Sequence, residues 1–189
     1  HVAFSLIAVP LLRKIVGNVD SHTDSSPFDR KPIIITGAGG TGKSQIIAAV
    51  RGLVTTWCQP QAVAVVASTG IAAASLQGTT IHSSVGLGIN TAELPKHITS
   101  PSDTLLRQWA LVHCVIADEL SMIDLGLFGL WEESLQYAKD NRGCDYGGVL
   151  VVLMFDHCQL RTVKGVPMFQ TKNGDTPLSP AQDLGLLLY

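Results

Sequence analysis

The segment that most constrains the fold of this chain is the glycine-rich loop GAGGTGKS at residues 37–44. It matches the pattern G-x-x-x-x-G-K-[ST] at every constrained position, and it lies between a short β-branched run at 32–37 and a helical pattern at 42–57. Glycines let the backbone wrap so that successive N–H groups point at phosphate oxygens, and the helix N-terminus adds a partial positive charge. The loop therefore predicts a strand–loop–helix unit that binds a nucleoside phosphate.

Two side chains of this loop have specific expected roles. Lys43 is expected to reach the β- and γ-phosphates, and the Ser44 hydroxyl is expected to bind Mg²⁺. The alternative is a chance match in a glycine-rich turn, and the flanking strand and helix argue against it. The residues expected to bind the nucleotide are Gly37, Gly39, Gly40, Thr41, Gly42, Lys43 and Ser44.

The apolar runs of the chain predict an α/β fold. Continuous rather than alternating runs at 61–69, 114–118 and 149–154 follow the loop strand, and helical patterns at 42–57 and 124–139 lie between them. Such strands form parallel sheets that helices cover on both faces, and their ligands bind at the carboxyl ends of the strands. The polar residues that follow each strand should therefore meet at one edge of the sheet.

The remaining segments give weaker expectations. Residues 2–16 predict an amphipathic helix with a kink or a break at Pro10, and residues 70–76 and 104–113 also predict helices. Residues 78–103 have a mixed, loop-like composition. The loop strand at 32–37 is expected to be buried.

An acidic pair supplies the second requirement of a nucleotide site. Asp118 and Glu119 follow directly on the apolar run at 114–118. Asp118 is the expected partner of Mg²⁺, and Glu119 is placed to polarise an attacking water molecule. The alternative is a pair of solvated acids at the start of the next helix, where carboxylates are favourable. Paired acids at this position favour nucleotide hydrolysis over nucleotide storage.

A second polar cluster, Asp156 to Gln159, follows the strand at 149–154. A metal site would join His157–Cys158 to His113–Cys114, but adjacent strand residues point to opposite faces, so each pair offers one ligand. A structural zinc site needs four ligands, and no zinc is expected. A Cys–His nucleophile lacks an orienting partner here. A third interpretation is a polar sensor of the nucleotide that uses Asp156 and Gln159, and the position of the cluster after a strand of the parallel sheet favours it.

Composition narrows the class of protein. The 189 residues are 46% apolar and 15% charged, which is typical of about one globular domain. A formal net charge of −2 argues against a free-standing nucleic-acid binder. Four cysteines without a C-x-x-C pair predict a reduced, intracellular protein, and no apolar run is long enough to span a membrane.

Three segments, in this order, resemble motifs of the petite-integration-frequency (PIF) family of superfamily 1 DNA helicases. They are ASTGIAAASLQGTTIHS at 67–83, ADELSMIDLGLF at 117–128 and GGVLVVLMFDHCQLRTVKGVPMF at 147–169. The similarity extends from about residue 3 to residue 169. The Ser-Thr-Gly-Ile-Ala-Ala and Thr-Ile-His-Ser elements are the most specific parts of it.

The resemblance implies a RecA-like motor domain that binds ATP and Mg²⁺ and moves along single-stranded DNA in the 5′-to-3′ direction. Family members serve DNA repair, recombination and telomere maintenance, and the implied location is nuclear or mitochondrial in a eukaryote. It further implies that Lys43, Asp118 and Glu119 serve hydrolysis and that Gln159 senses the γ-phosphate. The DNA contacts it implies are Thr69, Gly70, Thr80, His82 and Ser83.

The chain also departs from the family pattern. The upstream motif that contacts adenine would fall before His1, and the second motor domain would follow Tyr189, in the same chain or supplied by another. We therefore divide the chain into an N-terminal helix and linker at 1–30, a motor domain at 31–169 and a polar tail at 170–189. Such a chain is expected to bind nucleotide weakly, to hydrolyse it slowly at best and not to unwind DNA.

Further departures lie inside the third motif. Phe155 replaces a glycine and would either crowd the site or turn into the core, and Arg161–Thr162 replace two prolines that stiffen the loop. A catalytically silent nucleotide-binding module derived from a helicase is the main alternative. A small P-loop kinase is a second alternative, but residues 78–103 lack the arginines of a lid. On the RecA-like pattern, the strand at 149–154 should lie between the loop strand and the Asp118 strand.

Overall fold

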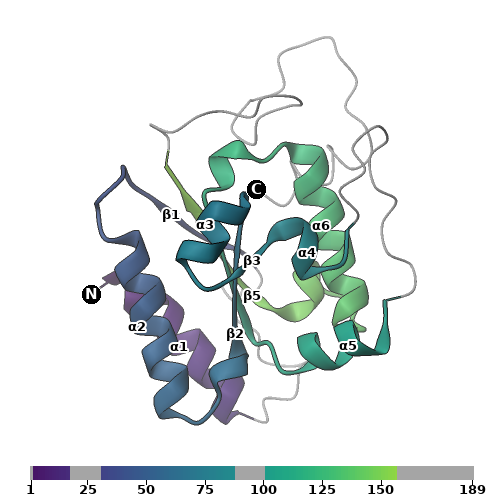
Figure 1. The fold of residues 1–189 in the computed structure, drawn as a ribbon. Helices are drawn as coiled ribbons and strands as arrows, with labels where there is room; N and C mark the ends of the chain where they lie inside the picture. The colour runs from purple at the N-terminus through teal and green to yellow at the C-terminus, as the bar shows by residue number, and fades with distance from the viewer. Residues whose placement is uncertain (1, 18–30, 88–100, 157–189) are drawn as a thin grey trace.

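The structure, a computed structural model, describes residues 2–17, 31–87 and 101–156. Within these residues, five parallel strands form one sheet in the order β1-β5-β4-β2-β3. The fifth strand thus lies between the strand of the phosphate loop and the strand of Asp118, and the predicted α/β layout is confirmed (Figure 1). The strands are β1 (Ile33–Thr36), β2 (Val63–Ala67), β3 (Thr79–Thr80), β4 (Cys114–Asp118) and β5 (Leu150–Phe155).

The register of the sheet aligns the carboxyl ends of its strands. Thr36 of β1 pairs with Phe155 of β5, and Asp118 of β4 pairs with Ala67 of β2. Because all pairs are parallel, the loops that follow these strands emerge at the same edge of the sheet. We call this edge the carboxyl rim and the opposite edge the amino end.

Helices cover both faces of the sheet (Figure 1). One face carries α1 and α2, and the other carries α4, α5 and α6. Along β4, Cys114 and Ile116 belong to the core under α1 and α2, whereas Val115 and Ala117 belong to the core under α6. This alternation follows from the two-residue period of a strand. The α-helices are α1 (Val2–Val16), α2 (Lys43–Thr56), α3 (Gly70–Ser75), α4 (Ile81–Ser84), α5 (Asp103–Ala110) and α6 (Leu125–Ala138).

Side chains at the N-cap start most of these helices. Asp124 Oδ1 accepts hydrogen bonds from the N–H groups of Gly126 and Leu127, at 2.7 and 3.1 Å, at the start of α6. Ser102 caps α5 by accepting from the N–H of Leu105 at 3.3 Å. In contrast, α2 begins after Gly42 without a side-chain cap. The N–H groups of Gln45 and Ile46 donate to the carbonyl of Gly42, at 3.0 and 3.3 Å, whereas those of Lys43 and Ser44 precede these bonds and are available to another acceptor.

A buried network fixes the short helix α4 against the larger helices of its face. The indole N–H of Trp109 donates to the carbonyl of Ser84 at 2.8 Å, and the indole N–H of Trp131 donates to the hydroxyl of Ser84 at 3.3 Å. The Ser84 hydroxyl in turn donates to the carbonyl of Ile81 at 2.7 Å. These bonds satisfy polar groups that would otherwise be costly to bury.

The amino end of the sheet is closed by α6 and the 3₁₀ turn η4 (Asp145–Gly148). The Lys139 ammonium donates to the carbonyls of Trp109, Ala110 and Val112, at 2.8, 3.4 and 3.0 Å, where α5 ends. Glu132, which is fully buried, accepts from the N–H of Tyr146 at 2.7 Å. These contacts hold the chain where it enters β4 and β5. Two further 3₁₀ turns are η2 (Pro60–Ala62) and η3 (Leu120–Met122).

Three expectations about the elements need correction. Residues 79–84 form β3 and α4 rather than loop, because β3 pairs with β2 and Thr80 caps α4. The loop strand β1 is alternately half-buried and exposed rather than buried, because Ile33 and Ile35 pack on the core under α1 and α2 whereas Ile34, on the other face, is exposed. Finally, α1 continues through Pro10, so a break at that residue is wrong. Residues 88–100 of the predicted loop lie outside the described part.

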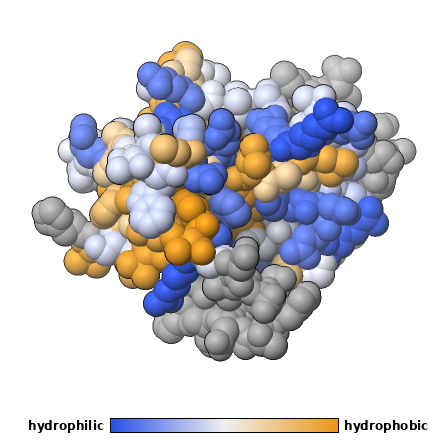
Figure 2. All heavy atoms as spheres, turned by 90° about the horizontal axis from the view of Figure 1, so that it is seen from below, coloured by the Kyte–Doolittle hydropathy of each residue, from blue (hydrophilic) through white to orange (hydrophobic). Residues whose placement is uncertain are grey.

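None of the helices formed by the described residues combines the length and the apolar character needed to cross a bilayer. Seen from below in Figure 2, apolar side chains gather in a patch left of the centre, and polar side chains predominate on the right.

Candidate nucleotide-binding site

The phosphate loop connects β1 to α2 at the carboxyl rim, and two of its glycines face open space. Gly40 and Gly42 have φ of 79° and 92°, in the left-handed region that glycine adopts readily, and a Cβ added to either would meet nothing within 4 Å. A neighbouring strand anchors the loop, because the N–H of Gly37 donates to the carbonyl of Phe155 at 3.1 Å. The backbone therefore wraps around a space without filling it.

Thr41 holds the shape of the loop from within. Its hydroxyl donates to the carbonyl of Ala38 at 2.8 Å. A Cβ on Gly37 would lie 2.6 Å from that hydroxyl oxygen, so Gly37 has to be glycine for the loop to close. Gly37 and Thr41 thus shape the loop, and neither lines the adjoining pocket.

Lys43 lies back over the loop and contacts three oxygen atoms. Its ammonium donates to the carbonyls of Gly37 and Ala38, the latter at 3.0 Å, and lies 3.8 Å from Oδ2 of Asp156. Asp156 follows β5 directly and is only 2% exposed. A buried carboxylate needs a compensating charge, and Lys43 supplies it. The side chain of the motif lysine is therefore tied to both β1 and β5.

Two carboxyl groups at the end of β4 lie beside this lysine. Asp118 is 7% exposed and accepts a hydrogen bond from the N–H of Glu119 at 2.9 Å. Burial raises the pKa of the Asp118 carboxyl, although the Glu119 N–H and the Lys43 charge oppose the rise. The pKa of Glu119 is also raised, first by burial and then by the negative charges of Asp118 and Asp156. The site thus concentrates negative charge around a single lysine.

Strand alternation explains why these acids share one side of the sheet. Asp118 has the parity of Cys114 and Ile116, whose side chains pack under α1 and α2, and Asp156 follows Met154 in the same way on β5. Both carboxyls therefore point to the side from which α2 starts. Glu119 interrupts the strand with a φ of 55°.

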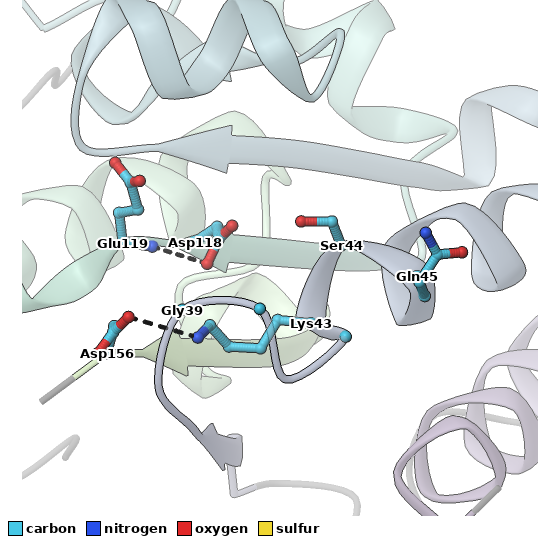
Figure 3. A pocket seen from close by; sticks show the side chains of 9 residues that line it. Gly39, Lys43, Ser44, Gln45, Asp118, Glu119 and Asp156 are labelled. Atoms are coloured by element: carbon cyan, nitrogen blue, oxygen red, sulfur yellow. Dashed lines mark hydrogen bonds and ion pairs between the residues drawn. The ribbon is translucent and has the colours of Figure 1, made fainter. Parts of the chain in front are cut away.

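These groups surround one pocket of about 390 Å³ (Figure 3). Figure 3 shows the hydroxyl of Ser44 and the carboxylate of Asp118 facing one another across it. The lining residues are Gly39, Gly40, Gly42, Lys43, Ser44, Gln45, Asp118, Glu119 and Asp156.

The donor set of this pocket fits a nucleotide with Mg²⁺. Mg²⁺ is commonly held by one or two carboxylates together with phosphate oxygens rather than by an all-protein cage. A hydroxyl and a carboxylate at the pocket wall meet this requirement, and the described residues hold no group of three His, Cys, Asp or Glu that forms such a cage. The uncapped start of α2 and the open glycines fit a phosphate chain.

One pocket residue was not predicted from the sequence, and three residues of the predicted sensor loop lie outside the described part of the chain. Gln45, the residue after the motif, lines the pocket and was not anticipated. The only available signal was its place in the first turn of α2. Gln159, Arg161 and Thr162 lie outside the described residues. Phe155 turns into the core with no exposed surface, so of its two expected positions the core is the one observed.

The residues expected to contact DNA lie on the same rim and begin two short helices. The Thr69 hydroxyl caps α3 by accepting from the N–H of Ala72 at 3.2 Å. The Thr80 hydroxyl caps α4, accepting from the N–H of Ser83 at 3.2 Å and donating to the Ser83 hydroxyl at 2.9 Å. Gly70 and Ser83 are exposed, whereas His82 is half-buried.

The cysteine interpretations find little support in the described residues. Cys114 lies in the core without exposed surface, and burial raises the pKa of its thiol to about 12. Such a thiol is a poor nucleophile at neutral pH. Burial, aided by the charges of Lys139 and Lys14, lowers the pKa of the adjacent His113. His157 and Cys158 are outside the described part of the chain.

The strand order, the phosphate loop between β1 and α2, and the acid that ends β4 together define a P-loop domain of the RecA-like α/β type. Solved structures support this class. A Pif1 helicase from Bacteroides in complex with ADP-AlF3 and single-stranded DNA aligns with a TM-score of 0.60 and 24% identity, over 81% of this chain and 33% of that one. The Pif1 helicase from Candida albicans aligns with a TM-score of 0.55 and 27% identity, over 82% and 34%.

The sequence comparisons identify the family. A family model described as PIF1-like helicase matches residues 12–172, and the chain belongs to that family. The ATP-dependent DNA helicase RRM3 of Saccharomyces cerevisiae is 34% identical over 175 residues, which are 82% of this chain and 24% of the relative. The human ATP-dependent DNA helicase PIF1 is 31% identical over 132 residues, which are 69% of this chain and 20% of the relative. The chain thus spans about a quarter or less of these relatives.

Proposed function

We propose that this chain is the ATP-binding motor domain of an ATP-dependent DNA helicase that moves 5′-to-3′ on single-stranded DNA. The observation that carries the proposal is the convergence of Lys43, Ser44, Asp118 and Glu119 on one pocket of about 390 Å³. Membership of the PIF1-like helicase family supports the same function. The proposed ligands are ATP and Mg²⁺.

The loop and Lys43 are proposed to bind the phosphates. The N–H groups around Gly40 and Gly42 and the uncapped start of α2 would donate to phosphate oxygens. For Lys43 to reach the same oxygens, its ammonium has to leave the carbonyls of Gly37 and Ala38. The negative charge of the phosphates would then replace those carbonyls as its partner.

Ser44 and Asp118 are proposed to hold Mg²⁺ together with the phosphates. When bound, the ion neutralises charge that develops on the phosphate oxygens during hydrolysis. Asp118 has to be ionised for this role. Burial raises the pKa of its carboxyl, and the charge of Lys43 opposes that rise. Glu119 is proposed to orient the attacking water and to accept its proton. A raised pKa makes a carboxylate a better proton acceptor.

The DNA contacts, the γ-phosphate sensor and a second motor domain are proposed from family membership. Thr69, Gly70, Thr80, His82 and Ser83 would face the DNA backbone, to which hydroxyl and N–H groups bind without regard to sequence. Gln159 would sense the γ-phosphate. A second motor domain would complete the DNA track and supply an arginine that stabilises the transition state. The division of this chain into segments 1–30, 31–169 and 170–189 remains a prediction.

The test is ATP hydrolysis by the chain, measured with and without an oligothymidylate, beside nucleotide binding measured with a fluorescent ATP analogue. Lys43→Ala is expected to lower the affinity for the analogue by at least about tenfold, because one charge-assisted contact is worth about 1.5–3 kcal/mol. Thr41→Ser is a matched control that keeps the hydroxyl contact to Ala38. DNA-stimulated turnover that depends on Lys43 would support a working motor domain.

The outcomes separate this function from its alternative. Nucleotide binding without turnover, with or without DNA, would support a catalytically silent nucleotide-binding module. Absence of nucleotide binding would overturn both. For a working motor domain that requires an arginine in trans, only slow turnover is expected from this chain alone, because such an arginine is worth about 10³ to 10⁵ in rate.

A further inference from the structure

Arg51, two turns into α2, bonds to the end of α3 rather than to an acid. Its guanidinium donates to the carbonyl of Leu76 and, at 3.0 Å, to the carbonyl of Gln77. Among the described residues, no carboxylate lies within ion-pair distance of it. Leu76 is the C-cap residue of α3 and Gln77 follows it, and a cation beside the carbonyls at the C-terminus of a helix complements the helix dipole. Arg51 therefore caps α3 from the helix that begins at the phosphate loop.

The turn that Arg51 holds is fixed closely on the sheet. Gln77 has a φ of 52°, and the N–H of Gly78 donates to the carbonyl of Ala73 at 2.8 Å. A Cβ on Gly78 would lie 2.4 Å from the carbonyl oxygen of Val65, so the turn sits directly on the backbone of β2. A shift of Leu76 and Gln77 would therefore have to move the start of β3.

This turn lies between the two groups of residues proposed to contact DNA. Thr69 begins α3 on one side of it, and Thr80 ends β3 and begins α4 on the other. One end of α3 is thus capped by a residue proposed to contact DNA, and the other end is capped by the helix that begins at Lys43.

We propose that Arg51 is a positioning residue that couples nucleotide binding at the start of α2 to DNA binding by residues 69–83. The inference rests on the proposed function and adds a physical link between its two ligands. A movement of α2 as Lys43 takes up phosphate is transmitted by the Arg51 guanidinium to the turn at 76–78. Because coupling between two ligands is reciprocal, DNA binding tightens nucleotide binding by the same factor.

The chain offers a matched control on the opposite face of the sheet. Lys139, the C-cap residue of α6, donates to three carbonyls at the end of α5, which is the same type of contact between a cation and a helix end. Among the described residues, its hydrogen bonds go neither to the phosphate loop nor to residues 69–83. Removing it should lower stability without affecting the coupling of the two ligands.

The experiment measures the affinity of the full chain for a fluorescent oligothymidylate, with and without saturating non-hydrolysable ATP analogue. The ratio of the two affinities is the coupling factor, which typically lies at about 5 to 150. Arg51→Ala is expected to bring this ratio within about twofold of one while each ligand still binds. Arg51→Lys, which keeps a cation able to reach one carbonyl, should retain an intermediate ratio. Lys139→Ala should keep the wild-type ratio and lower the Tm.

Each outcome either supports or overturns the coupling role of Arg51. A wild-type ratio in folded Arg51→Ala would overturn the coupling role, and so would a loss of coupling in Lys139→Ala equal to that in Arg51→Ala. If Arg51→Ala does not fold, an unchanged ratio in Arg51→Lys overturns the role and a reduced ratio supports it. Wild-type chain that binds both ligands with a ratio of one overturns this inference alone. Wild-type chain that binds neither overturns the proposed function as well.

Discussion

The two ends of the sheet use the same kinds of residues to opposite effect. At the carboxyl rim, two glycines with positive φ, a lysine on backbone carbonyls and a buried carboxyl surround a pocket. At the amino end, the same three kinds of residue form a filled structure. Gly147 has a φ of 63°, Lys139 bonds to carbonyls of the α5 end, and Glu132 is fully buried.

The two ends of the sheet differ in the room around their glycines. A Cβ on Gly40 or Gly42 would meet nothing within 4 Å, whereas a Cβ on Gly147 would lie 2.6 Å from Cβ of Lys139 and 3.0 Å from the carbonyl oxygen of Leu135. The rim glycines therefore provide a backbone shape and room for a ligand. The amino-end glycine allows two segments to pack in contact. Glycine with positive φ marks a binding site only where it borders empty space.

The largest effect on stability is expected from Gly147→Ala. The new methyl group would clash with Cβ of Lys139 and press on the carbonyl oxygen of Leu135, and alanine would have an unfavourable φ, so the free energy of unfolding should fall by about 3 kcal/mol. Urea unfolding measures this change. Gly52→Ala in α2, with neither a clash nor a positive φ, is the control. Loss of nucleotide affinity per folded molecule would contradict the assignment of Gly147 to packing.

A smaller loss of stability with a larger loss of binding is expected from Gly40→Ala. No atom opposes the methyl group, so the unfavourable φ alone should lower the free energy of unfolding, by about 1 kcal/mol. The methyl group would occupy room in the pocket, and affinity for a fluorescent ATP analogue should fall. Unchanged affinity together with a stability loss as large as that of Gly147→Ala would erase the distinction between the two ends.

The smallest effect is expected in the pH dependence of stability, from Glu132→Gln. Burial raises the pKa of Glu132, while hydrogen bonds from Gln136 and Tyr146 oppose the rise. The folded chain therefore binds this proton more tightly than the unfolded chain does, and stability falls as pH rises from the ordinary pKa of about 4.3 through the raised value. The glutamine variant should lose that fall, so it gains stability relative to wild type as pH increases.

Urea unfolding at several pH values between 4 and 8 measures this difference. Glu133→Gln is the matched control, because it removes the same charge one residue away on α6, where the side chain is half-buried rather than fully buried. The Glu133 charge is the smallest of the causes that act on the pKa of Glu132, so this variant should follow the wild-type curve closely. Parallel stability–pH curves for wild type and Glu132→Gln would show that the Glu132 carboxyl has no such effect.

Local patterns predicted the parts of the site that the chain presents in order. The phosphate loop, the apolar run before Asp118 and the run before Asp156 each encode a strand and the loop that follows it. The position of β5 between β1 and β4 followed once the RecA-like pattern was assumed, and it is confirmed. These features are predictable because a continuous apolar run and a glycine loop are determined over fewer than about ten residues.

Contacts between distant segments could not be predicted in this way. The two-residue strand β3 exists because it pairs with β2, and its own residues carry too little pattern. Arg51 and Lys139 bond to backbone carbonyls, which every residue has. The sequence therefore contains no particular residue type that would identify their partners. Thr69 and Thr80 matched a family motif, and their role as helix caps became evident only from the positions of the following N–H groups.

The position of β1 at the edge of the described sheet has a consequence for how the site fails on heating. Its one neighbour there is β5, which also bonds the loop through the carbonyl of Phe155 and carries Asp156 to Lys43. The phosphate loop and the carboxylate beside it therefore share a single support. Fraying of this edge would abolish both halves of the phosphate site together, before the interior strands β4 and β2 separate.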